Sequence, residues 1–285
     1  MSIALLTVMS VFDLRLVHET SNGIMKLLVD AGNTRVKWAL AESQVGTLVE
    51  NGILESNIIN SGVVDADWSA LADYVGKVES VWLSCVASEQ VRDLISSQAE
   101  EMFGLQPHIA TVSADAAGMV NGYRDLSKLG VDRWLAALGA RALVDEGDLI
   151  VIDAGTAVTI DLVSAENRFE GGAILPGFTS MHDALLGRTA GIQSQPSAVE
   201  SVIGKNTRDC VNSGAHFGLL GAIERVVAEI VGLVQAGQSQ RGLSSKAPRL
   251  LIMGGDADRI VKGSTLDLEI QSSMIFYGLI LISKL

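Results

Sequence analysis

A short pattern that occurs twice constrains this chain more than any other feature. The segment LLVDAGNTRVKWAL at 27–40 matches IVIDAGTAVTIDLV at 150–163 in outline, so the run Asp-Ala-Gly begins at Asp30 and again at Asp153. Each copy is an apolar run that ends in Asp, followed by a glycine turn and a second β-rich run, which predicts a β-hairpin. The chain is therefore expected to contain one domain plan built twice, with a carboxylate at the end of each hairpin.

A single Asp-x-Gly turn between strands is more often structural than functional. Turn chemistry does not explain why both copies also share the apolar run and a following amide or hydroxyl residue, Asn33 and Thr34 in the first copy and Thr156 in the second. Gly32 and Gly155 have no Cβ, so backbone N–H groups there can approach an anion closely. The duplication predicts two turns that face a phosphate chain with its metal.

Composition narrows the class of protein. The chain has 285 residues, of which 48% are hydrophobic and 19% charged, and its formal net charge is −12. This length suits one or two domains with a sizeable core. The acidic balance, with scattered basic residues and no aromatic ladder, argues against a nucleic-acid surface. The two cysteines, Cys85 and Cys210, lie in apolar segments and predict free thiols in a reducing cytoplasm.

The first 24 residues contain a short apolar stretch without a basic segment before it or a small-residue cleavage site after it. This pattern predicts neither a signal peptide nor a membrane span. Because the first expected strand begins directly after Met25, we interpret residues 1–24 as an N-terminal extension. Its deletion is expected to leave folding and activity intact.

Hydrophobic periodicity predicts an alternation of strands and helices in both halves of the chain. Strands are expected at 47–55, 78–88, 149–154 and 157–163, within RFEGGAILPG at 168–177, and before Gly254; helices are expected at 88–104, 131–144, 207–235 and 272–284. Val131, Leu135, Leu138 and Ala142 form the expected apolar face of the second helix. A charged loop at 145–148 marks the expected boundary between a first domain, 25–147, and a second domain, 148–285.

The long helix expected at 207–235 contains three glycines, Gly214, Gly218 and Gly221. A glycine inside a helix costs about 1 kcal/mol relative to alanine. Close packing against another helix or a contact between subunits is the expected compensation, and the sequence favours both equally.

Known signatures leave few alternatives for the chemistry. The sequence has no GxxxxGK[ST] or GxGxxG phosphate loop, no GxSxG nucleophile turn and no HExxH metal pair, and its four histidines are isolated. A strand that ends in Gly254 and Gly255 lets the backbone lie against a nucleobase or ribose. Together with the two hairpins, this order predicts a nucleotide site between two lobes, the arrangement of actin-like ATPases.

The remaining polar cluster, GVDR at 130–133, opens the second helix. An Asp in a first helical turn is commonly a stabilising cap, and Arg133 would then be solvated. In a nucleotide cleft, however, a kinase requires a carboxylate beside the acceptor hydroxyl and a cation for an anionic acceptor. Asp132 and Arg133 provide these two groups.

Four segments, taken in order, resemble the motifs of the type III pantothenate kinase family, which lies within the actin-like ATPase superfamily: DAGNTRVK at 30–37, GVDR at 130–133, DAGTAVTID at 153–161 and GGAILPG at 171–177. The likeness extends from Met25 to Leu285, and the match of Gly254 and Gly255 to an adenosine motif is looser. It implies an α/β fold of two duplicated ribonuclease-H-like, actin-like ATPase domains with the active site in the cleft between them. It also implies transfer of the ATP γ-phosphate to the 4′-hydroxyl of pantothenate, the first step of coenzyme A biosynthesis.

The resemblance also implies roles for individual residues. Asp132 would be the proton acceptor, and the pantothenate-binding residues would be Tyr123, Gly130, Val131, Asp132, Arg133 and Thr189. The ATP-binding residues would be Asp30, Ala31, Gly32, Asn33, Thr34, Arg35, Val36, Lys37 and Thr156. Asp153 would bind a monovalent cation, K⁺ or NH₄⁺, and Mg²⁺ would accompany ATP. The family is homodimeric, with the acceptor site completed at the interface and no membrane or nucleic-acid partner.

Two other functions remain open on the sequence. Another small-molecule kinase or phosphatase on the same fold, such as a sugar kinase, is disfavoured by the GVDR and GGAILPG motifs. A non-catalytic regulatory accessory factor is disfavoured by the intact Asp30, Asp132, Asp153 and Thr156, and the acidic net charge argues against direct DNA binding.

Overall fold

The structure is a computed structural model that describes residues 23–56, 66–189, 191–192, 194–199, 201–242, 244 and 246–284. The expected N-terminal extension lies outside these residues except for its last two. The strands are β1 Met25–Ala31, β2 Val36–Glu42, β3 Leu48–Ser56, β4 Ala66–Asp67, β5 Val78–Cys85, β6 His108–Ile109, β7 Asp115–Ala116, β8 Met119–Asn121, β9 Leu149–Ala154, β10 Ala157–Ser164, β11 Arg168–Pro176, β12 Arg249–Met253 and β13 Leu268–Ile270. The helices are α1 Glu89–Phe103, α2 Val131–Leu143, α3 Phe178–Leu186, α4 Thr207–Gln240, α5 Ala257–Gly263 and α6 Met274–Ile282, with 3₁₀ turns at Ser69–Tyr74 and Leu126–Lys128.

The two sheets follow one plan, as the repeated hairpin predicts. The first has the strand order β4-β3-β2-β1-β5-β6 and the second β13-β12-β9-β10-β11-β8-β7. In both, the second strand of the hairpin is antiparallel to the first hairpin strand and to the strand that follows, whereas two later strands run parallel to the first hairpin strand. The chain is therefore an α/β protein made of two duplicated domains of the actin-like ATPase type.

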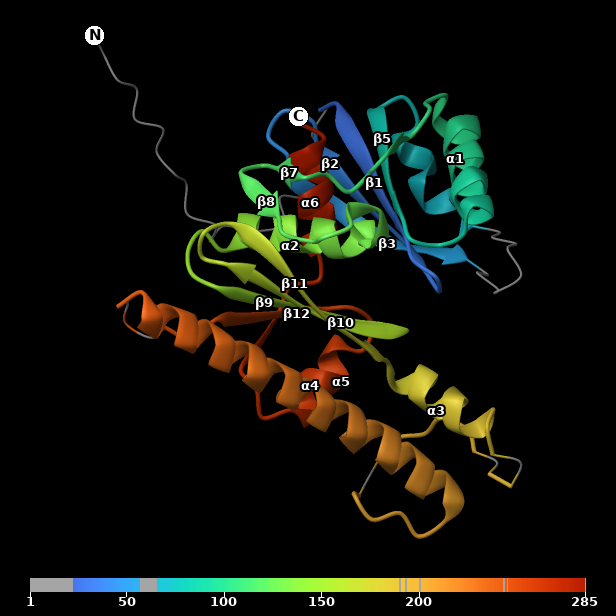
Figure 1. The fold of residues 1–285 in the computed structure, drawn as a ribbon. Coiled ribbons are helices and arrows are strands. Elements are labelled where there is room, and N and C mark those ends of the chain that lie inside the picture. The colour runs from blue at the N-terminus through green and yellow to red at the C-terminus, as the bar shows by residue number, and fades with distance from the viewer. Residues whose placement is uncertain are drawn as a thin grey trace.

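The two domains are stacked as layers (Figure 1). Alternate residues of a strand point to opposite faces of its sheet, and on β1 Leu27 and Val29 pack with α1 while Leu28 packs with the cluster around α2 and α6. The second sheet is covered in the same way, by α2 and α6 on one face and by α4 and α5 on the other. Helices α2 and α6 thus form a shared layer between the two sheets.

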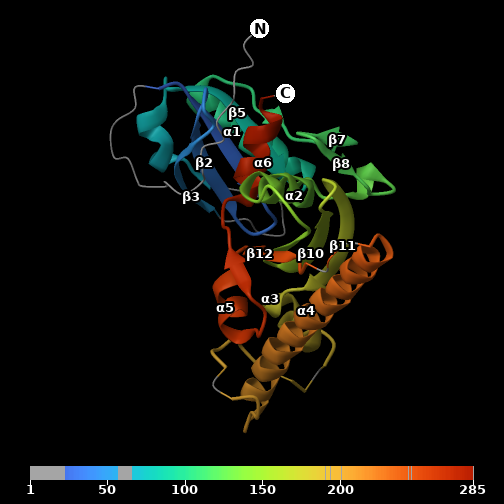
Figure 2. The same cartoon turned by 90° about the vertical axis from the view of Figure 1, so that its left-hand side faces the viewer.

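Helices α2 and α6 cross in direct backbone contact. A Cβ added at Gly139 would overlap the carbonyl oxygen of Met274, and one added at Gly278 would overlap that of Leu135. Figure 2 shows α6, near the end of the chain, lying beside α2 within the first lobe. The Lys26 ammonium on β1 donates to the Ser283 carbonyl at 2.9 Å, which fastens the end of α6 to the first sheet.

The elements differ from the sequence expectations in several places. The short hairpin β7–β8 joins the second sheet although it precedes the expected boundary at 145–148. The sequence pattern predicts no residue ranges for α3, α5 and β13, which the structure contains. Ala142 was expected on the apolar face of α2 but is exposed, because the last turn of the helix emerges from between the sheets. The division into 25–147 and 148–285 stays a prediction.

Helix α4 is longer than expected, and its glycines Gly214, Gly218 and Gly221 have little or no contact with other elements of the described chain. Among the described residues, no atom lies within 4 Å of a Cβ built at Gly214 or Gly221, and at Gly218 the nearest is the Met181 Cε at 3.9 Å. Close packing within the chain therefore does not explain these glycines.

Among the helices in the described part of the chain, none has the length and apolar character needed to cross a membrane.

Candidate active site

The tips of the two Asp-Ala-Gly hairpins touch each other across the gap between the domains. In each turn the glycine N–H donates to a nearby backbone carbonyl. The Gly32 N–H donates to the Arg35 carbonyl and the Gly155 N–H to the Ala157 carbonyl, both at 3.0 Å. The hydroxyl oxygens of Thr34 and Thr156 are 2.8 Å apart. The two repeats thus bring their turn residues to one place.

Asp30 lies near the end of the central strand of the first sheet, where its neighbours on both adjacent strands are polar. Lys37 is its partner in register on β2 and Ser84 its partner on β5, and the Ser84 hydroxyl donates to Asp30 Oδ1 at 3.1 Å. Burial raises the pKa of Asp30 to about 7, in spite of the Lys37 charge, which lowers it. Ser84 was not anticipated, because it looks like one small residue in a buried strand.

Asp153 occupies the equivalent position in the second sheet, and the two carboxylates belong to one charged cluster. Burial raises the pKa of Asp153 to about 6, opposed by Lys37 and reinforced by the negative charge of Asp132. Asp132 and Asp153 also raise the pKa of Asp30. The charges of Lys37 and Asp132 therefore act on both hairpin carboxylates, and a cation or a cation-bearing ligand would relieve the repulsion among the acids.

The start of α2 holds Asp132 in a fixed direction. Gly130 is the N-cap residue, and a Cβ there would overlap Asp132 Oδ1. The backbone N–H of Arg133 donates to Asp132 Oδ1 at 2.8 Å. Burial raises the pKa of Asp132, although this hydrogen bond and the Arg133 charge lower it. The carboxylate at this helix end is thus both oriented and unusually basic for an aspartate.

Arg133 was expected to face an anionic substrate, but its guanidinium is 7% exposed and paired within the protein. It forms a two-bond ion pair with Asp161 of β10, with Nε to Oδ2 at 3.0 Å and Nη2 bonded to Oδ1. The rings of Tyr123 and Phe169 lie 5.7 and 6.0 Å from the guanidinium carbon. Asp161 lies within the DAGTAVTID segment but was not identified as a site residue.

Other expected residues lie at different distances from this cluster. Arg35, at the first tip, reaches across to the second domain, where its Nη1 lies 3.1 Å from a Cβ built at Gly255. Gly254 has a φ of +101°, and a Cβ there would overlap the carbonyl oxygen of Ala154, so the Gly pair brings the backbone against β9. Thr189 follows α3, which projects away from α2 (Figure 1), and its hydroxyl donates to the Leu185 carbonyl at 2.7 Å.

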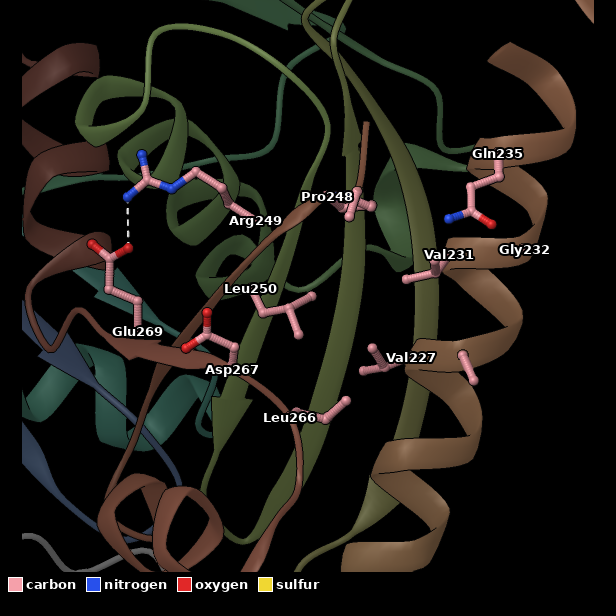
Figure 3. Close-up of a pocket in the computed structure, with 12 residues that line it drawn as sticks. Val227, Val231, Gly232, Gln235, Pro248, Arg249, Leu250, Leu266, Asp267 and Glu269 are labelled. Atoms are coloured by element: carbon pink, nitrogen blue, oxygen red, sulfur yellow. Dashed lines mark hydrogen bonds and ion pairs between the residues drawn. The ribbon is translucent and has the colours of Figure 1, made fainter. Parts of the chain in front are cut away.

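A groove elsewhere on the second domain lacks comparable chemistry. It lies between α4 and the strands β12 and β13, has a volume of about 540 Å³ and is lined mainly by apolar residues such as Val227, Val231, Leu250 and Leu266 (Figure 3). Its rim carries the ion pair of Arg249 and Glu269, at 2.6 Å. The groove opens where β12 begins, whereas Asp153 is in register with the last residue of β12. The groove therefore lies at the other end of the strands from Asp153.

Comparisons with known proteins agree with this geometry. The family described as type III pantothenate kinase matches residues 26–229. A relative of that name from Methylibium petroleiphilum is 36% identical over 263 residues, which cover 90% of this chain and 97% of the relative. Another from Leptothrix cholodnii is 35% identical, with coverage of 89% and 94%.

Among solved structures, a conserved putative Baf family transcriptional activator from Campylobacter jejuni has a similar fold. Its TM-score is 0.50 at 19% sequence identity, and the match covers 90% of this chain and 98% of that one. At this identity the likeness concerns the fold alone. The match to the family over most of the sequence, together with the two curated relatives, establishes that the chain belongs to the type III pantothenate kinase family.

Proposed function

We propose that this protein transfers the γ-phosphoryl group of ATP to the 4′-hydroxyl of pantothenate, with Asp132 as the proton acceptor. The observation that carries the proposal is the contact between the two hairpin turns at Thr34 and Thr156, with Asp132 at the start of α2 near enough for its charge to raise the pKa of Asp30 and Asp153. Family membership adds the substrate pair. A nucleotide clamp and an acceptor-side carboxylate thus lie within one cluster.

In this mechanism the protein mainly positions the reactants and stabilises charge, which is what phosphoryl transfer demands. The turn at 32–35, Lys37 and Thr156 bind the triphosphate, and the hydroxyls of Thr34 and Thr156 exchange their mutual hydrogen bond for phosphate oxygens. Asp132 orients the acceptor hydroxyl in line with the γ-phosphorus and takes its proton as the new O–P bond forms and ADP leaves. Tyr123, Gly130 and Val131 line the proposed pantothenate site, and Arg133 supports it from behind through its buried ion pair with Asp161.

The carboxylates suit hard cations, which prefer oxygen ligands. Among the described residues, no three His, Cys, Asp or Glu side chains are grouped so as to hold a metal ion by themselves. Mg²⁺ commonly binds through one or two carboxylates together with substrate phosphates, and Asp30 fits that pattern. Asp153 is the residue proposed for K⁺ or NH₄⁺. These cations would neutralise phosphate charge that Lys37 alone does not balance.

A requirement for a monovalent cation is the direct prediction of this assignment. If Asp153 binds K⁺ or NH₄⁺, activity with ATP, Mg²⁺ and pantothenate is expected in KCl or NH₄Cl and is expected to be lost in NaCl at equal ionic strength. Initial rates in the three salts measure this, with a coupling system checked separately in each. Equal rates in potassium and sodium would remove Asp153 from this role.

We infer that the enzyme works as a homodimer in which Thr189 contacts the pantothenate of the partner subunit. Thr189 follows α3, the helix that projects from the second sheet away from α2 (Figure 1). Exposed apolar side chains near that region, Ile174, Leu185 and Phe217, and the open glycines of α4 would be covered by such a contact. The symmetric arrangement is the commonest one for soluble oligomers.

Mixing two inactive variants tests this arrangement. Asp132→Asn and Thr189→Val are each expected to have low activity alone, but a mixed dimer has one site that combines an intact Asp132 with an intact Thr189 from the other chain. After subunit exchange, activity is expected to rise to roughly a quarter of wild type, since half the dimers are mixed and one site of two is intact. No gain on mixing would place Thr189 in its own chain's site.

The proposed location is the cytoplasm, which suits the two free thiols, Cys85 and Cys210. A coupled assay with ATP and pantothenate on the wild type and on Asp132→Asn decides the proposed function. Sugar acceptors belong in the same assay, because faster phosphorylation of a sugar would favour the alternative kinase. Wild-type protein without activity on any acceptor would instead favour the regulatory accessory factor.

A further inference from the structure

We propose that Asp161 is a positioning residue for the reaction: it holds Arg133, and through Arg133 it fixes the direction of the Asp132 carboxylate. This inference rests on the proposed function and adds to it a residue on the second sheet. Two consecutive contacts connect Asp161 with Asp132 through Arg133, and a further restraint acts on Asp161 itself.

The first restraint acts on Asp161 itself. It lies on β10, the central strand of the second sheet, where its partners in register are Val151 on β9 and Gly172 on β11. A Cβ added at Gly172 would lie 2.6 Å from Asp161 Oδ1 and would overlap the carbonyl oxygen of Ile160. The second glycine of the GGAILPG segment therefore leaves the space that this carboxylate occupies, and no larger side chain fits there.

The second restraint is the ion pair with Arg133. The two side chains are only 6% and 3% exposed, and the guanidinium binds both carboxylate oxygens. Such two-bond pairs fix geometry more strictly than single contacts. The rings of Tyr123 and Phe169 lie over the guanidinium, at distances compatible with cation–π attraction. The Arg133 guanidinium is therefore restrained by the carboxylate of Asp161 and by the two aromatic rings.

The third restraint joins Arg133 to the catalytic carboxylate. The Arg133 backbone N–H donates to Asp132 Oδ1 at 2.8 Å. A shift of Arg133 would move this donor, and Asp132 Oδ1 with it. Asp161 also neutralises the guanidinium, so that Asp132 is not drawn into an ion pair with it and keeps the basicity that the proposed proton transfer requires.

Stability alone does not account for this arrangement. A buried ion pair contributes little net stability, because the desolvation of two charges offsets their attraction, and well-packed apolar residues often replace such a pair without loss. Removal of one partner, in contrast, leaves an unpaired buried charge. The ion pair connects the second sheet with the first turn of α2, and this turn carries Asp132, the proposed proton acceptor.

The test compares Asp161→Asn with wild type in steady-state kinetics and thermal unfolding. Asn keeps the shape of the side chain but loses its charge and one guanidinium bond. Because a displacement of about 1 Å at a catalytic group can cost 10²-fold in rate, kcat is expected to fall on the order of 10²-fold. The KM for ATP is expected to stay within about 2-fold of wild type, since the triphosphate binds at the hairpin turns. Unchanged kcat in a folded Asp161→Asn protein would overturn the inference.

A second variant covers the case in which Asp161→Asn does not fold. Arg133→Met combined with Asp161→Leu removes both charges, and this kind of exchange is tolerated in protein interiors. The folded double variant is expected to show the same loss of kcat, and wild-type kcat would overturn the inference.

A matched control uses Arg141, another partly buried arginine of α2, whose guanidinium donates to the carbonyls of Val144, Gly147 and Ser164. Arg141→Met is expected to lower the unfolding temperature with kcat and both KM values unchanged. A fall in kcat equal to that of Asp161→Asn would mean that any loosening of α2 suffices, which contradicts a specific role.

The wild-type protein separates the two proposals. If it does not phosphorylate pantothenate, both the proposed function and this inference are overturned. If it is active and the Asp161 variants are unaffected, the inference alone is overturned.

Discussion

Asp132→Asn is expected to lower kcat for pantothenate by about 10²–10⁴-fold, the usual contribution of a general base. The amide keeps the size of the carboxylate and can still accept the hydrogen bond from the Arg133 N–H, but it cannot take the proton of the acceptor hydroxyl. ATP binding is expected to stay close to that of wild type, because in the proposed mechanism the hairpin turns and not Asp132 bind the triphosphate. Steady-state kinetics and calorimetric titration with ATP measure the two effects.

The same variant has a predicted effect on stability, with a defined sign. Burial raises the pKa of Asp132 in the folded protein above its unfolded value. The folded state therefore loses stability as the pH rises through that pKa, since the ionised carboxylate is less favourable in the protein than in water. The neutral amide does not titrate, so Asp132→Asn is expected to unfold at the same temperature as wild type or higher, with the difference growing as the pH rises from the unfolded pKa through the raised folded pKa.

A control at an exposed aspartate separates a local effect from a loss of overall charge. Asp145 lies in the loop after α2 and is exposed. Asp145→Asn is expected to leave kcat unchanged. Near-normal turnover of Asp132→Asn would remove this residue from the proton transfer, whatever its effect on stability.

Gly139→Ala is expected to destabilise the protein by about 3 kcal/mol, the upper part of the usual range for overpacked cores. The added methyl group would overlap the Met274 carbonyl oxygen, and the obstacle is backbone that cannot rotate away. Gly278→Ala is expected to behave in the same way, because its methyl group would overlap the Leu135 carbonyl oxygen. Denaturant unfolding of the purified variants measures the change in the free energy of unfolding.

Gly232→Ala provides the matched control with the opposite sign. Gly232 lies inside α4, and no described atom comes within 4 Å of a Cβ built there. Alanine is favoured over glycine in a helix by about 1 kcal/mol, so this variant is expected to be more stable than wild type. If Gly139→Ala were as stable as wild type, α2 and α6 would not be in the backbone contact described above.

The local part of the fold was predictable from the sequence because it depends on short patterns. The two hairpins and helix α1 follow from alternation, from the Ser88 cap and from Gly104, which has the left-handed conformation at the helix end. The position of α6 was not predictable, since an apolar helix at the end of a chain has no local signal for the layer it joins. The short strands β7 and β8 were missed for a similar reason, because they gain their stability from the edge of the second sheet.

The candidate site shows the same division. Asp30, Asp132 and Asp153 could be selected because each lies at a recognisable junction, two at strand ends and one at a helix start. The state of Arg133 could not be predicted, because it depends on a carboxylate that the second sheet supplies across the layer boundary. Whether an arginine faces a ligand or a buried partner is decided by packing, which spacing in the sequence does not encode.

The crowded carboxylates have a consequence for how this chain can change over time. Burial raises the pKa of Asp30 to about 7 and that of Asp153 to about 6, so the ionised forms that gain population as the pH rises through these values cost the folded protein stability. Most substitutions destabilise a protein, but replacement of these acids by neutral residues would stabilise it, and only the loss of activity opposes such a change. In a lineage that no longer depended on the reaction, these positions would drift first. Their identity is therefore a more sensitive record of retained catalysis than overall similarity.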